Sequence, residues 1–186
     1  VKRGVITTPP LKRAIKKYLL KFLFKRCSRV LYSCSGNKEY LRHYGVPEHK
    51  LFLIPCAVDN EYFRLQKSNY LSNYGDIRNE LNISENDYVI VFSARMTVRK
   101  RPMDLLISLE KASENNIMAL FIGSAPDMNL LESYVNERGI RAKFIGYKTQ
   151  NEISKYYTIA DAGVILSDYD PSPKSLNEMM NFSIPI

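Results

Sequence analysis

The chain has 186 residues, of which 45% are hydrophobic and 25% charged, an ordinary balance for one globular domain or slightly more. Its three cysteines, Cys27, Cys34 and Cys56, form no CxxC pair, so the sequence predicts a reducing compartment and no disulfide framework. There is no cluster of metal-ligating residues, and no apolar run of about 18 residues that would predict a membrane-spanning helix.

The net charge of +8 is concentrated near one end of the chain. Residues 1–30 contain ten Lys or Arg and no acidic residue, which leaves 17 basic and 19 acidic side chains, a charge of −2, in the other 156 residues. This distribution indicates one basic element and argues against a nucleic-acid-binding domain. Because Val1 is not a natural start, we expect the chain to be a piece of a longer protein.

The first expected element is a helix that begins at about Leu11, after Pro9-Pro10, and carries the basic residues on one side. Apolar residues recur at i, i+3, i+4 and i+7 on the other side. They are Leu11, Ala14, Ile15, Tyr18, Leu19, Phe22 and Leu23. The pattern is typical of a surface helix packed on a core, and also of a helix lying on an anionic membrane surface through residues 11–26; both can hold together.

The remaining elements are expected in regular order. A short strand at 30–34, a helix at 37–43 and a strand at 51–54 precede a polar segment, 57–75, which we interpret as a linker. A short helix is expected at 76–81. After it we expect strands at 88–93, 117–122, 142–145 and 162–167, alternating with helices at 102–114, 126–138, 149–158 and 174–182. This alternation predicts an α/β fold, a Rossmann-like doubly wound parallel sheet, with a further strand beginning at Ile186.

In such a sheet, ligands bind beyond the carboxyl ends of the strands. Arg95 and Lys100 follow the first of these strands, where they are suited to holding a diphosphate by charge-assisted hydrogen bonds. Four of the seven residues 95–101 are basic, and such a composition is also typical of a solvated loop. Gly123 follows the next strand, and Gly146 and Tyr147 follow the third. Glycine there allows close approach of a ligand, or simply makes the turn into the next helix.

The segment after the fourth strand is the most informative. Asp170 and Glu178 flank a turn, Pro171-Ser172-Pro173, that leads into the last helix. The backbone N–H groups of Ser172, Lys174 and Ser175 are expected to stay free near a helix N-terminus, where an anion is favoured. Carboxylates on both flanks suit hydroxyl groups, so the pattern predicts a ligand that is part phosphate and part sugar.

The tripeptide Asp168-Tyr169-Asp170 permits a different interpretation. Paired carboxylates of this kind hold Mn²⁺ or Mg²⁺ against a diphosphate in a different, metal-dependent fold. Here the tripeptide precedes a proline-rich turn in a doubly wound pattern, and Arg95 and Lys100 already supply positive charge, so we expect no metal.

Taken together, these motifs resemble the retaining glycosyltransferases of family 4 (glycosyl transferases group 1), which have the two-domain GT-B fold. Four matches carry the resemblance over residues 28–186: Tyr44–Pro55 with Ala57-Val-Asp59 and Phe63, the spacing of Arg95 and Lys100, the pair Ala160-Asp161, and the separation of Asp170 from Glu178. Four residues depart from the family pattern: Asp170 stands where glutamate is usual, Pro173 and Ser183 where glycine is frequent, and Cys56 where asparagine is usual.

The resemblance implies a role for each matched residue. Glu178 would accept hydrogen bonds from the ribose of a nucleotide diphosphate sugar, and Arg95 and Lys100 would hold the diphosphate of this donor. Arg95, Lys100 and Asp170 are the expected catalytic residues. The remaining expected donor-binding residues are Ser172, Pro173, Lys174, Ser175, Gly123, Gly146 and Tyr147. The reaction would retain the anomeric configuration and use no cofactor besides the donor.

The resemblance also implies a domain organisation. Residues 1–56 would be the remnant of an acceptor-binding domain with the interdomain segment, 57–75 a linker, and 76–186 a truncated donor-binding domain. The isolated chain would bind donor at most, without turnover. We expect a cytoplasmic enzyme of polysaccharide or glycolipid assembly, peripheral on the inner membrane face, with an acceptor such as a lipid-linked glycan. The alternatives are a membrane- or nucleic-acid-binding module built on residues 11–26, a sugar epimerase or phosphorylase, and a Rossmann-like domain whose motifs carry no activity.

Overall fold

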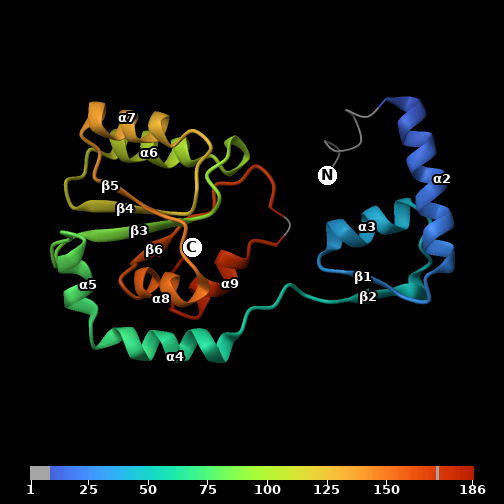
Figure 1. Ribbon diagram of the computed structural model, residues 1–186, viewed down its shortest axis with the longest axis horizontal. Coiled ribbons are helices and arrows are strands. Elements are labelled where there is room, and N and C mark those ends of the chain that lie inside the picture. The colour runs from blue at the N-terminus through green and yellow to red at the C-terminus, as the bar shows by residue number, and fades with distance from the viewer. Residues whose placement is uncertain (1–8, 171) are drawn as a thin grey trace. The chain divides into compact units, whose positions relative to one another are not determined.

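The structure is a computed structural model that describes residues 9–170 and 172–186, with Pro10 described by its backbone alone (Figure 1). The chain divides into two compact units, Val1–Ala57 and Val58–Ile186, which are described separately. No helix in the described part of the chain is both long and apolar enough to cross a membrane.

The first unit is a small α/β unit with two parallel strands. Its elements are α2 (Pro10–Arg26), β1 (Val30–Tyr32), α3 (Ser35–His43), the 3-10 helix η1 (Glu48–Lys50) and β2 (Leu51–Leu53). β1 pairs with β2 from Val30↔Leu51 onward. Leu41, Val46 and Leu51 form its buried core. The Lys50 ammonium holds the end of α2 by donating to the carbonyls of Lys25 (3.2 Å) and Cys27 (2.7 Å).

Helix α2 forms where the sequence predicts it, but it packs through a different face. The large apolar residues of the predicted stripe, among them Leu11, Tyr18 and Leu19, are exposed. The partly covered positions are Leu20 and Phe24, of which Phe24 packs against the core of the first unit. Lys16 of α2 lies over the rings of Tyr40 in α3 and Tyr44 at its C-cap. The covered face of α2 is therefore the one that meets α3, and the apolar stripe does not determine it.

The second unit contains a four-stranded parallel sheet in the order β5-β4-β3-β6. Its strands are β3 (Tyr88–Ser93), β4 (Ile117–Ile122), β5 (Ala142–Gly146) and β6 (Ala162–Gly163). Its helices are α4 (Asn60–Leu71), α5 (Tyr74–Glu80), the 3-10 helix η2 (Val98–Lys100), α6 (Pro102–Ala112), α7 (Met128–Arg138), α8 (Gln150–Thr158) and α9 (Lys174–Met180). The predicted strands 88–93 and 117–122 are confirmed at both ends.

Helices cover both faces of this sheet, as the alternating sequence predicts (Figure 1). On one face, Phe92 of β3 and Phe121 of β4 pack against Leu106 of α6 and Leu131 of α7. The alternate residues of the strands point to the other face, where they form a second core together with side chains of α4, α5, α8 and α9. A fully buried strand has no solvent side, so its apolar residues run without interruption.

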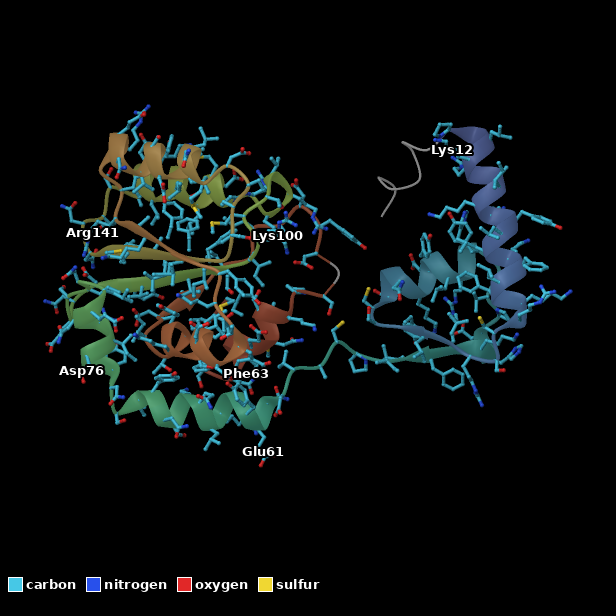
Figure 2. All side chains as sticks on the ribbon, viewed as in Figure 1. Lys12, Glu61, Phe63, Asp76, Lys100 and Arg141 are labelled. Atoms are coloured by element: carbon cyan, nitrogen blue, oxygen red, sulfur yellow. The ribbon has the colours of Figure 1, made fainter. Side chains whose placement is uncertain are left out.

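The segment 57–75 is not a linker, which corrects the prediction from its polar composition. Residues 60–71 form α4, whose N-cap Asp59 accepts a hydrogen bond from the backbone N–H of Tyr62 (2.9 Å). Phe63 is wholly buried and its ring lies 6.1 Å from that of Phe182. Figure 2 shows Phe63 on the side of α4 that faces the helices over the sheet. Phe63 is the fully buried residue of the helix, Tyr62 and Tyr70 pack beside it, and most of the exposed residues are polar.

Strand β6 is shorter than predicted. The sequence indicates 162–167, whereas the structure pairs Ala162 and Gly163 with β3 and ends the strand there. Beyond the hydrogen bond from Val164 N–H to the Val91 carbonyl (3.0 Å), the chain leaves the sheet and enters the loop that carries Asp170. Next to β6, the Pro185 carbonyl accepts a hydrogen bond from Gly163 N–H (2.8 Å), and the further strand expected from Ile186 onward stays a prediction.

A buried polar cluster holds the amino ends of the strands together. Arg78, only 3% exposed, donates to the Tyr74 hydroxyl (2.8 Å) and to the carbonyls of Ser84 (2.8 Å) and Asp87 (2.5 Å). The Asp87 carboxylate pairs with the guanidinium of Arg141, which lowers the pKa of Asp87 to about 2. Asp87 is therefore ionised at neutral pH, and this edge of the sheet is fixed by charge-assisted hydrogen bonds.

Candidate functional site

The opposite edge of the sheet collects the residues that the sequence analysis singles out. All four strands are parallel, so their carboxyl ends meet at one edge, where ligands bind in open α/β sheets. Figure 2 shows Lys100 at this edge, while Arg141 lies at the other. A wider surface hollow at the start of α7 is lined only by Pro126–Leu130, a single stretch of chain, and it gathers none of these strand ends.

Lys100 and Asp170 come together at this edge, although 70 residues separate them. Lys100 closes η2, and its ammonium forms an ion pair with the Asp170 carboxylate. The two side chains are 16% and 15% exposed, so the pair is largely shielded from water. A small cleft surrounds it. The cleft is lined by Phe92, Ser93, Ala94, Lys100, Val164, Ile165, Leu166, Ser167, Asp170, Pro173 and Ser175.

A second ion pair fixes the same loop. Asp168 donates its backbone N–H to the Arg99 carbonyl (3.1 Å), and its carboxylate lies 3.4 Å from the Arg101 guanidinium, where both side chains are nearly half exposed. Both carboxylates of the Asp168-Tyr-Asp170 tripeptide therefore face cationic side chains. Within residues 9–170 and 172–186, no group of three or more His, Cys, Asp or Glu is placed to hold a metal ion.

Glu178 lies on α9 and belongs to a hydrogen-bonded group that the sequence analysis missed. Its Oε2 lies 3.1 Å from the Tyr157 hydroxyl, which lies 2.9 Å from Oγ of Ser93. Burial raises the pKa of Glu178, and the Tyr157 hydrogen bond and the charge of Lys174 oppose that rise. Nothing in the sequence distinguishes Tyr157 from an ordinary core tyrosine, since Tyr156 precedes it on the same helix.

The predicted anion site at the start of α9 is only partly described. Pro171 lies outside the described residues, and Pro173 is the N-cap of a helix that begins at Lys174 and ends at Met180, two residues before the predicted end. Ser172 and Ser175 are half-buried, and Lys174 is exposed. Ser175 and Pro173 line the cleft, whereas Lys174 and Ser172 do not.

The other predicted residues lie at the same edge but outside the cleft. Arg95 is exposed, and its side chain makes no ion pair or hydrogen bond within the described chain. Tyr147 is 75% exposed. Gly146 has open space around its Cα, whereas a Cβ added to Gly123 would lie 2.1 Å from the Ala94 carbonyl oxygen. Close backbone packing between the ends of β3 and β4 therefore accounts for Gly123 without a ligand.

Comparisons with known proteins show the family and the fold of the chain. A model of the family named glycosyl transferases group 1 matches residues 73–186. MJ1607 of Methanocaldococcus jannaschii, described as an uncharacterized glycosyltransferase, is 25% identical over 166 residues, which is 88% of this chain and 42% of that protein. The crystal structure of a Rickettsia africae glycosyltransferase superposes with a TM-score of 0.78 at 18% identity, covering 95% of this chain and 47% of that one.

Anabaena HepE, solved in complex with UDP and glucose, superposes with a TM-score of 0.72 at 17% identity over 91% of this chain and 47% of its own. This chain thus spans less than half the length of each of these three proteins. The likeness confirms the predicted α/β fold with parallel sheets, as found in GT-B glycosyltransferases. Because the family model covers more than half of its residues, the chain belongs to the glycosyl transferases group 1 family.

Proposed function

We propose that residues 58–186 bind the nucleotide diphosphate sugar of a retaining glycosyltransferase at the carboxyl edge of the sheet. One observation carries the proposal: the end of β3 at Ser93 is associated with both a shielded cation, Lys100, and a half-buried carboxylate, Glu178. Lys100 lines the cleft together with Ser93, and Glu178 connects to Ser93 through Tyr157. A cation for a diphosphate and an acceptor for ribose hydroxyls are what this donor needs.

In this proposal the cations act on the leaving group. Lys100, helped by the exposed Arg95, holds the diphosphate and stabilises the negative charge that grows on it as the sugar departs. The diphosphate replaces Asp170 as the partner of Lys100, which releases the Asp170 carboxylate to accept hydrogen bonds from the sugar. The backbone N–H groups of Ser172, Lys174 and Ser175 contact the sugar or its phosphate, and Gly146 and Tyr147 lie near the base. In this proposal the positive charges of Lys100 and Arg95 stabilise the departing diphosphate without a metal ion.

Binding of nucleotides tests the donor site. With UDP, ADP and GDP in turn, we expect one nucleotide to raise the thermal midpoint of the intact protein, because a ligand at about a hundredfold excess over its Kd stabilises the native state by about 2.7 kcal/mol. Glu178→Ala should raise the Kd for this nucleotide about 100-fold, because two hydrogen bonds to an ionised group are lost. UDP is the first probe, since HepE is a protein of this fold that was solved with UDP.

The matched control is Glu137→Ala, which removes the same charge from the exposed side of α7. It should leave the nucleotide-induced shift unchanged. An equal shift in wild type and Glu178→Ala would refute the assignment of Glu178 to ribose. No shift with any of the three nucleotides would refute the donor site.

We also propose that α2 rests on an anionic membrane surface, where a lipid-linked acceptor would be found. The supporting observation is that its apolar residues, including Leu11, Ile15 and Tyr18, are exposed beside its basic residues. Such a helix lies in the interface with its apolar side in the headgroup region and its lysines near anionic lipids. A location on the cytoplasmic face of the membrane, in polysaccharide or glycolipid assembly, is part of this proposal.

Replacement of Lys12, Lys17 and Lys25 by glutamine should weaken binding to vesicles that contain phosphatidylglycerol about 100-fold, since each lysine near such a surface contributes about 1 kcal/mol. Flotation at low salt measures the effect. The control carries the same three changes at Lys111, Lys143 and Lys148, outside α2, and should float like the wild type. A wild-type protein that stays unbound at low salt would exclude the membrane role.

A further inference from the structure

The Tyr157 side chain places a hydroxyl inside an otherwise apolar core. Tyr157 is 0% exposed, and its ring lies 5.5 Å from that of Phe182. A buried tyrosine hydroxyl needs hydrogen-bond partners, because an unpaired one loses its interaction with water without compensation. Its partners here are Glu178 Oε2, at 3.1 Å, and Ser93 Oγ, at 2.9 Å. One hydroxyl thus connects the end of α8 with the end of β3 and with α9.

The chemistry of the three groups fixes the direction of these bonds. An ionised carboxylate can only accept, and a tyrosine hydroxyl has one proton. Tyr157 therefore donates its proton to Glu178 Oε2, and its lone pairs are left to accept the Ser93 hydroxyl. Glu178 Oε1 has no hydrogen-bond partner among the described residues. One carboxylate oxygen is thus held by the core, while the other remains for a ligand.

We infer that Tyr157 is the positioning residue for Glu178: it holds Oε2 so that the carboxylate is oriented to accept the ribose hydroxyls of the donor. The inference rests on the proposed function, because it concerns the same carboxylate. The hydrogen bond also favours the ionised carboxylate, since it opposes the rise in pKa that burial causes. Tyr157 itself touches no substrate in this arrangement and acts only through Glu178.

Tyr157→Phe tests the inference, because phenylalanine keeps the buried ring and removes only the hydroxyl. Tyr156→Phe is the matched control. It changes the adjacent residue of α8, which is also buried in this core but has no hydroxyl hydrogen bond within the described chain. Circular dichroism and thermal unfolding first establish that both variants of the intact protein fold. Calorimetry then measures the Kd of UDP, ADP and GDP and of their 2′,3′-dideoxy analogues, which lack the ribose hydroxyls.

The wild-type protein should bind one ribonucleotide more tightly than its dideoxy analogue. Tyr157→Phe should raise the Kd of the ribonucleotide about tenfold, because a carboxylate that is no longer held in place loses about one of its hydrogen bonds to ribose, and it should leave the Kd of the dideoxy analogue unchanged. Tyr156→Phe should change neither. In a Glu178→Ala background, Tyr157→Phe should have no further effect on the Kd, because the carboxylate that it positions is gone.

Three outcomes would overturn the inference, and they are distinguishable. Tyr157 supports only the fold if Tyr157→Phe weakens the binding of the ribonucleotide and of its dideoxy analogue equally. The same holds if Tyr157→Phe also weakens the binding of the ribonucleotide in the Glu178→Ala background. If the wild type itself does not distinguish the ribonucleotide from its dideoxy analogue, the assignment of Glu178 to ribose fails, and the role of Tyr157 fails with it.

Discussion

Lys100→Met should lower the release of nucleoside diphosphate from a nucleotide sugar by the intact protein on the order of 100- to 1,000-fold, mainly in kcat. Lys100 is the shielded cation of the cleft, and methionine keeps much of its length without the charge. In a site shielded from water, fixed charge stabilises the departing diphosphate more than it would in solution. Steady-state assays with the nucleotide sugar whose nucleotide binds will measure the change.

Three further variants separate this role from that of an ion pair that holds the loop. Lys100→Arg keeps the charge and should retain part of the activity. Lys111→Met, on the exposed side of α6, should retain all of it. The double variant Lys100→Met/Asp170→Asn removes both charges of the pair, so the loop contains no unpaired carboxylate. If this double variant recovers wild-type turnover, Lys100 serves only to neutralise Asp170, and its assignment to the diphosphate is wrong.

Arg78→Met should lower the free energy of unfolding of the second unit by about 3–5 kcal/mol, a large part of the ~5–15 kcal/mol that stabilises a typical domain. The guanidinium is buried and makes hydrogen bonds to the carbonyls of Ser84 and Asp87 and an ion pair with Asp161 at 3.9 Å. Methionine fills a similar space but donates nothing, so the buried carbonyls of Asp87 and Ile159 lose their donor. Urea unfolding followed by circular dichroism measures the loss.

Arg138→Met is the control for this prediction. Arg138 also pairs with a carboxylate, that of Glu110 at 3.3 Å, but its side chain is 54% exposed. Pairs on the surface contribute about 0–1 kcal/mol, so we expect little change. Equal losses for the two variants would show that Arg78 does not hold the amino ends of the strands together.

The sequence alone predicts the sheet of the second unit well. Two buried strands, 88–93 and 117–122, are confirmed at both ends because long apolar runs leave little choice of boundary. Strand 162–167 is overestimated for the opposite reason. Its apolar run continues to Leu166, but only Ala162 and Gly163 lie opposite β3 in the sheet. An apolar run marks burial, and it does not show whether a neighbouring strand is present to pair with.

Composition was a poorer guide in residues 57–75 and in α2. Polar residues outnumber apolar ones in α4, yet the buried Phe63, with Tyr62 and Tyr70 packed beside it, anchors the helix on the core. Helix α2 does have the predicted apolar stripe, but it packs through the face that contacts Tyr40 and Tyr44. Which face of a helix is covered depends on its neighbours in space, and the pattern along the helix does not contain that information.

For the candidate site, the sequence determined the chemistry and the position of each group along the chain. Arg95, Lys100, Asp170 and Glu178 follow strands, and parallel strands end at one edge, so their general location could be predicted. The tertiary structure decided which of them meet. Because β6 lies beside β3, Lys100 pairs with Asp170, and Tyr157 joins Ser93 to Glu178. These contacts link residues 21 to 70 positions apart, and such long-range pairings follow from the order of strands in the sheet, which local sequence does not specify.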